Sequence, residues 1–161
     1  MKRRRQPINH LTYTLLDEMT ASPTQPLPEA TRRHQLTRMW AGLAAIEKSP
    51  APTADDWRVC SDAVNLMETL VDMYVVQDNS GLLQDAITAL ALSGKRHMTG
   101  TAIRLDAQGI QAIRAVLEDY ASVIEQVSAR TMIHCHRLTE RRIREILSGK
   151  KRPHDIEIIN L

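Results

Sequence analysis

The sequence predicts an all-α protein, a bundle of four to five helices with an extended basic N-terminal arm and a short C-terminal tail. The 161 residues include no Phe and only 3% aromatic residues, so aliphatic side chains and Met must build the core, which favours helix over sheet. Apolar residues also recur every three to four positions, the period of an amphipathic helix. A chain of this length fits one hydrophobic core. We therefore assign residues 1–28 to the arm, 29–149 to the bundle and 150–161 to the tail.

The arm begins with four basic residues and ends in a proline-rich stretch. Residues 8–16 are apolar enough to contact the bundle, whereas the three prolines between Thr20 and Pro28 prevent a regular helix there. We expect an extended or partly ordered segment.

Two helices are expected next. The first begins with Pro28 and Glu29, which suit a first helical turn, and ends near Lys48, before a segment with two prolines. The second begins at Thr53, three residues before Asp56, in an acidic variant of the capping box. Its expected buried stripe consists of Trp57, Cys60, Val64, Met67, Leu70, Val71 and Tyr74.

A third helix follows a turn and runs from Leu82 past Ala91. It is close to continuously apolar, so we expect it to be central and to end between Gly94 and Gly100. A fourth helix should begin at Asp106, a suitable N-cap. Its apolar residues have a heptad-like spacing that could also serve as the seam of a homodimer. They are Ile110, Ile113, Leu117, Tyr120, Ile124 and Val127.

The apolar pattern falters at residues 128–131. Ser128 can cap a fifth helix there, with Gly149 at its C′ position. The alternative is one continuous helix of about 40 residues, roughly 60 Å long. The tail alternates apolar and polar residues and could lie across the bundle or pair with a partner.

Charge is strongly segregated, although the formal net charge is only +2. Residues 1–5 contain four Lys/Arg, and residues 130–152 contain eight Lys/Arg against two Glu. Residues 6–129 contain nine Lys/Arg against fifteen Asp/Glu. An acidic body with basic ends suits an end-on contact with a polyanion, or mutual neutralisation within a dimer.

The fifth helix gathers its basic residues on one face. At about 100° per residue, five basic side chains between Arg130 and Arg144 fall within roughly 80° of one another. The opposite, packing face consists of Met132, Cys135, Thr139, Ile143 and Ile146. A row of guanidinium groups suits phosphates or a partner's carboxylates; the alternative is a solvated helix face. The candidate residues for binding nucleic acid or an acidic protein partner are Arg130, His134, Arg137, Arg141, Arg144, Lys150, Lys151, Arg152, Lys2, Arg3, Arg4 and Arg5.

No aromatic residue is expected near this face, because the Trp and Tyr residues of the bundle fall on predicted core stripes. Stacking with single-stranded nucleic acid is disfavoured accordingly.

We expect no metal, no cofactor and no enzyme activity. The run His134-Cys135-His136 lacks the spacing of three or four residues that brings two ligands together on a helix. The chain has no Gly-rich phosphate loop, no His-Glu-x-x-His and no Gly-x-Ser-x-Gly motif. The two cysteines follow no spacing pattern, and no apolar run follows the basic start of the chain. We therefore expect a reduced cytoplasmic protein with no membrane contact.

Three stretches resemble a known family. Residues 56–68 (DWRVCSDAVNLME), 104–113 (RLDAQGIQAI) and 141–149 (RRIREILSG) are similar to short helical proteins encoded in bacterial prophages and plasmids. Those proteins begin with a basic arm and are often labelled Fis-like transcriptional regulators, and the likeness covers most of residues 2–149. The resemblance implies a mobile-element setting, in which small non-enzymatic proteins regulate genes or block host defences by occluding a nucleoprotein complex.

Together these observations predict a non-enzymatic binding protein of a phage or plasmid, which engages nucleic acid or a host complex that handles it. Inhibition of a host-defence complex, in the manner of an anti-CRISPR protein, is one form of this hypothesis. A DNA-binding regulator of the element's own genes is the alternative, but a helix-turn-helix needs two short helices and a tight turn that commonly contains Gly, which residues 128–131 lack. A structural homodimer is the third possibility.

Overall fold

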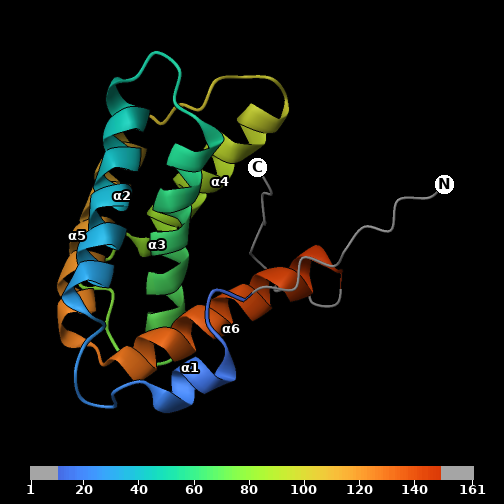
Figure 1. Ribbon diagram of the computed structural model, residues 1–161. Helices are drawn as coiled ribbons and strands as arrows, with labels where there is room; N and C mark the ends of the chain where they lie inside the picture. Colours follow the sequence, from blue (N-terminus) through green and yellow to red (C-terminus); the bar gives the residue numbers. More distant parts are fainter. Residues whose placement is uncertain (1–10, 150–161) are drawn as a thin grey trace.

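The computed structural model describes residues 11–149, which form six α-helices and no strand (Figure 1). The all-α class is confirmed. The helices are α1 (Leu15–Thr20), α2 (Glu29–Lys48), α3 (Ala54–Asp72), α4 (Leu83–Met98), α5 (Ala107–Gln126) and α6 (Ala129–Leu147). The helix beyond the four or five expected is α1, which lies inside the stretch assigned to the arm. The basic residues 2–5 and the whole tail, residues 150–161, lie outside the described residues.

Helices α2 to α5 form a bundle, and α6 crosses one end of it with α1 alongside (Figure 1). α3 packs against α2, α4, α5 and α6, whereas α4 packs chiefly against α3 and α5. The central helix is therefore α3, and the expectation that the apolar segment after Leu82 is central was wrong. One side of α4 faces solvent, as the 50% exposure of Leu92 shows.

The helices begin where the capping residues predict. Thr53 and Asp56 form both hydrogen bonds of a capping box, with the Asp56 N–H donating to the Thr53 hydroxyl at 3.2 Å. The Asp106 carboxylate accepts from the Gly109 N–H at 2.6 Å, and the Ser128 hydroxyl accepts from the Thr131 N–H at 3.3 Å. The chain breaks at Val127 and Ser128, so the single long helix was the wrong alternative.

The first turn of α6 is also held by the proline-rich segment, which contains no regular helix between residues 21 and 28. The Ala129 N–H donates to the Gln25 carbonyl oxygen at 2.7 Å, and the Arg130 N–H donates to the Ser22 carbonyl oxygen at 3.0 Å. Both N–H groups lack partners inside the helix, as the first donors of every α-helix do. The segment thus fixes where α6 starts.

One helix end agrees with the prediction and one differs. α4 ends at Met98, within the range expected between Gly94 and Gly100; Gly94 is buried in packing, and the basic residues after it suit the negative end of the helix dipole. α3 ends at Asp72, and Tyr74 takes a left-handed conformation (φ 57°) that leaves its side chain 95% exposed. The prediction that Tyr74 is buried was wrong, because the chain already leaves the helix before that position.

The heptad-like residues of α5 point into the bundle. Ile113, Leu117, Tyr120 and Ile124 are each at most 2% exposed, so this seam belongs to the chain's own core. Within residues 11–149, no helix combines the length and the apolarity needed to cross a membrane.

α2 and α3 approach each other closely at Gly42. A Cβ at this position of α2 would lie 2.8 Å from the Asp56 carbonyl oxygen of α3 and would overlap the Val59 side chain. The absence of a side chain therefore lets α2 and α3 meet.

Gly42→Ala should destabilise the protein. Replacing a glycine inside a helix normally stabilises it by up to about 1 kcal/mol, but overpacking here should cost about 1–3 kcal/mol instead. Urea unfolding of both proteins, monitored by circular dichroism, measures the change. A more stable variant would contradict the close packing of α2 on α3.

Candidate functional site

The proximal half of α6, residues 129–140, seats the helix on the bundle. Cys135 is fully buried, and Thr139 is buried against α3, where its hydroxyl lies 2.7 Å from that of Thr69. Each hydroxyl also lies within hydrogen-bonding distance of the carbonyl oxygen four residues earlier in its own helix. The predicted packing face is confirmed over this half of the helix.

The distal half of α6, residues 141–147, projects beyond the bundle (Figure 1). None of its residues is buried, and Ile143 and Ile146, which continue the packing face, are only partly covered. The end of α6 is therefore accessible to solvent and carries both apolar and charged side chains.

The opposite face carries the basic row, defined as Arg130, His134, Arg137, Arg141 and Arg144, and α1 covers its proximal part. The Glu18 carboxylate accepts one hydrogen bond from His134 Nδ1 at 2.8 Å and one from Arg137 Nη1. Arg130 Nη2 donates to the Met19 carbonyl oxygen at 3.3 Å. Three members of the row therefore contact the chain's own α1.

The residues before α1 contact α6 as well. The Thr12 N–H donates to the Glu140 carboxylate at 3.1 Å, and the Thr12 hydroxyl donates to the same group. The Tyr13 ring meets His136 edge-on, with 5.3 Å between the ring centroids. α1 is thus held to α6 on both sides of Glu18.

Two opposing effects set the pKa of Glu18. Burial acts to raise the pKa of the carboxyl, but the hydrogen bonds and positive charges of Arg137 and His134 together outweigh it and hold the pKa below its ordinary value. The carboxylate therefore stays charged, and its link to α6 holds at neutral pH.

Arg141 and Arg144 differ from the other arginines of α6. Within residues 11–149 their side chains make no hydrogen bond or ion pair, and Arg141 is exposed. They line a shallow hollow together with Leu11, Arg137, Glu145 and Ser148, so one carboxylate lies among its three arginines. Arg142, which was not among the candidates, instead pairs across to α3.

Arg142 has a structural role, because it pairs with two acidic residues of α3. Its Nη2 lies 2.6 Å from Glu68 and its Nη1 lies 3.5 Å from Asp72, both on α3. This side chain is 22% exposed. Arg142 therefore fastens α6 to the bundle, whereas Arg141 and Arg144 form no ion pair with any residue between 11 and 149.

The sequence contains a signal for α1 that the assignment of residues 1–28 to an extended arm did not take into account. Thr14 and Asp17 form a capping box, in which the Thr14 N–H donates to Asp17 at 2.6 Å and the Asp17 N–H donates back to the Thr14 hydroxyl at 3.2 Å. This is the same pattern that located α3. The pairing of Glu18 with α6 has no such local signal.

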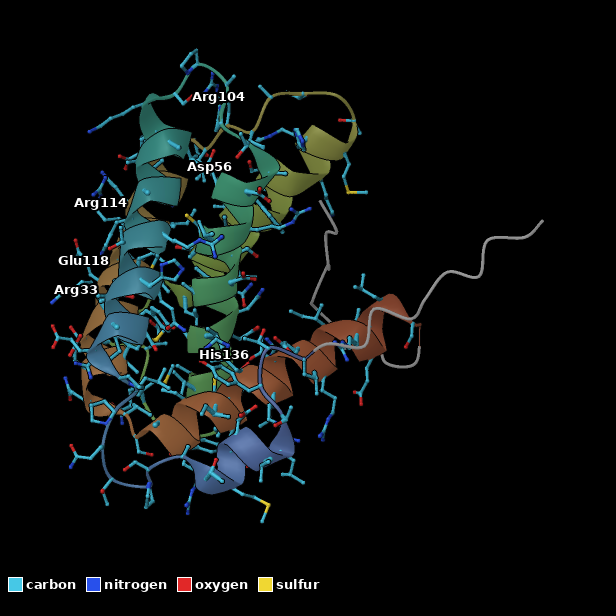
Figure 2. All side chains as sticks on the ribbon, in the orientation of Figure 1. Arg33, Asp56, Arg104, Arg114, Glu118 and His136 are labelled. Carbon is cyan, nitrogen blue, oxygen red and sulfur yellow. The ribbon has the colours of Figure 1, made fainter. Side chains whose placement is uncertain are left out.

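A second hollow lies between α2, α3 and α6, and Figure 2 shows His136 at the junction of α6 with the bundle. Burial lowers the pKa of His136, and Glu140 offsets this only in part. The pKa of Asp62 is raised because surrounding protein displaces water from it, although its side chain keeps access to solvent. His136 Nε2 is buried and has no hydrogen-bond partner among the described residues.

The run His134-Cys135-His136 points in three directions. His134 faces Glu18, the Cys135 thiol donates to a carbonyl of α3, and His136 faces the second hollow. In the part of the chain that the structure describes, no three His, Cys, Asp or Glu side chains are placed to hold a metal ion. Burial also raises the pKa of the Cys60 and Cys135 thiols to about 12, which keeps both protonated.

An aromatic side chain is available for stacking at the end of α3. Tyr74 is 95% exposed, so the expectation that all Trp and Tyr residues of the bundle lie on core stripes was wrong. Tyr74 stands two residues after Asp72, a partner of Arg142. Single-stranded nucleic acid therefore has to be considered alongside duplex.

Comparison with known proteins identifies no relative: no family model, no curated protein and no solved structure matches this chain. The resemblance to prophage and plasmid proteins and the function inferred from it stay predictions.

Protein stability should fall as the pH drops below about 6.5, the ordinary pKa of His, because His136 has a lowered pKa in the folded protein. The unfolded chain then binds a proton that the folded chain does not, which costs at most about 1.4 kcal/mol per pH unit. Chemical denaturation of the parent protein and His136→Gln at pH 7.5 and pH 5.5 measures this. The variant should lose less stability between the two; equal losses would contradict the burial of a neutral His136.

Proposed function

We propose that this protein is a non-catalytic binding protein that docks on the phosphates of nucleic acid through the distal half of α6. The observation that carries the proposal is the pair Arg141 and Arg144. They lie one helical turn apart on the projecting end of the helix and have no partner within residues 11–149. Guanidinium groups at this spacing suit a row of phosphates.

The surrounding charge supports a polyanion as the partner. Lys150, Lys151 and Arg152 directly follow the last described residue, and residues 2–5 are separated by only five residues from Leu11, which lines the same hollow as Arg141 and Arg144. Such a concentration of positive charge attracts nucleic acid of any sequence and makes the affinity strongly dependent on salt.

The geometry supports charge-driven docking better than a sequence-reading regulator. A helix-turn-helix requires the recognition helix to pack on the short helix before it. Here α5 has 20 residues, and α6 packs chiefly on α3 and α1. In a mobile-element setting, occlusion of a host nucleoprotein complex, such as a defence complex, is the form of activity that we favour.

The cysteines bear on the cellular compartment, and the α5 seam bears on self-association. The two cysteines are free and buried, which suits the reducing cytoplasm. The α5 seam that suggested a homodimer lies in the chain's own core, so a dimer would need another surface.

Arg141→Ala together with Arg144→Ala should weaken binding to a labelled 30-base-pair duplex of arbitrary sequence by at least about 10-fold at low salt, and should flatten the salt dependence by about two units of log–log slope. Fluorescence anisotropy over a salt series measures both, and a single strand of equal length tests the alternative with Tyr74.

The matched control is Arg33→Ala together with Arg58→Ala. It removes the same charge from α2 and α3, and Figure 2 places Arg33 on the outer side of α2, across the molecule from the distal half of α6. Equal effects of the two double variants, or no binding by the parent protein, would overturn the proposal. A preference for the element's own promoter at physiological salt would favour the regulator.

A further inference from the structure

We infer that the face of α6 beneath α1 is a second part of the anion-binding surface, and that Glu18 occupies it as a stand-in for a phosphate of nucleic acid. The inference rests on the proposed function. It adds that duplex nucleic acid displaces α1 and so gains contacts that are covered in the free protein.

The site beneath α1 already binds an anion. One oxygen of the Glu18 carboxylate meets His134 at 2.8 Å and the other meets Arg137, whose side chain is only 13% exposed. A phosphate group offers the same arrangement of charged oxygens to the same donors. In the folded chain the His134 ring and the Arg137 guanidinium therefore already converge on one anionic group.

α1 is attached in a way that permits displacement. None of its residues is buried, and its apolar residues Leu15, Leu16 and Met19 are 56%, 68% and 66% exposed. It has six residues, far fewer than an isolated helix needs for stability. Polar links to α6 therefore hold it, and its release would leave the hydrophobic core of the bundle in place.

The segments on either side keep α1 tethered. Tyr13 before it and Ala21 after it pack against the core, and Ser22 binds the first turn of α6. The movement required is thus the opening of a short strap over residues 14–20, with both ends fixed.

Opening the strap would complete the basic row. The row runs from Arg130 to Arg144, which are 14 residues apart. This separation is about 21 Å along the helix axis and matches about six phosphate steps of one DNA strand. With α1 in place, Arg141 and Arg144 are the members of the row that have no hydrogen-bond or ion-pair partner between residues 11 and 149. Glu18 and the phosphates compete for one continuous surface.

Glu18→Gln tests the inference through a binding measurement. It removes the competing charge but retains the size of the side chain, so it should tighten binding of the 30-base-pair duplex about 3- to 10-fold and steepen the salt dependence by about one unit of log–log slope. Fluorescence anisotropy measures both, and circular dichroism confirms that the fold is retained.

The matched control is Glu29→Gln, which removes the same charge from α2, where Glu29 pairs with Arg33 and is 70% exposed. Its effect on affinity should be small, and Arg137→Gln added to Glu18→Gln should remove the gain. Equal effects of Glu18→Gln and Glu29→Gln overturn the inference but leave the proposed function standing, provided that the Arg141 and Arg144 variants lose affinity. If neither the parent nor Glu18→Gln binds duplex, both proposals fail.

Discussion

The position of the basic surface depends on how α6 is seated. Buried side chains, among them Met132, Cys135 and Thr139, hold the proximal half of the helix on the bundle, and the Thr69 and Thr139 hydroxyls lie 2.7 Å apart where α6 meets α3. Beyond Thr139 no residue of the helix is buried, so the rest of α6 extends from the end of the bundle. Because packing on the bundle uses only one face of α6, charged side chains can occupy the opposite face.

The arginines of α6 fall into three groups according to what they contact. Arg142 fastens the helix to acidic residues of α3, and Arg137 binds the carboxylate of Glu18 on α1. Arg141 and Arg144 have no such partner within residues 11–149. The positive charges of Arg141 and Arg144 repel one another, the nearby Glu145 offsets that repulsion only in part, and an external anion would relieve it further. This difference is the reason that we propose Arg141 and Arg144, and not Arg142, as contacts for an external anion.

The sequence predicted the features that depend on neighbours a few residues apart. Capping residues such as Thr53 and Ser128 located the helix starts, and the helical period separated the packing face of α6 from its charged face. Features that depend on contacts far apart in the chain could not be predicted. Glu18 binds Arg137 across 119 positions, and no local pattern marks that pair. Tyr74 is exposed because of a left-handed turn that the apolar spacing does not reveal.

The central claim is that α1 and nucleic acid compete for one face of α6. Amide hydrogen exchange, measured on the full chain with and without duplex DNA, tests it directly. We predict that DNA speeds exchange in residues 15–20 of α1 and slows exchange in residues 141–147 of α6, while α2 to α5 are unchanged. Binding of DNA with exchange in α1 unchanged or slowed would contradict the claim.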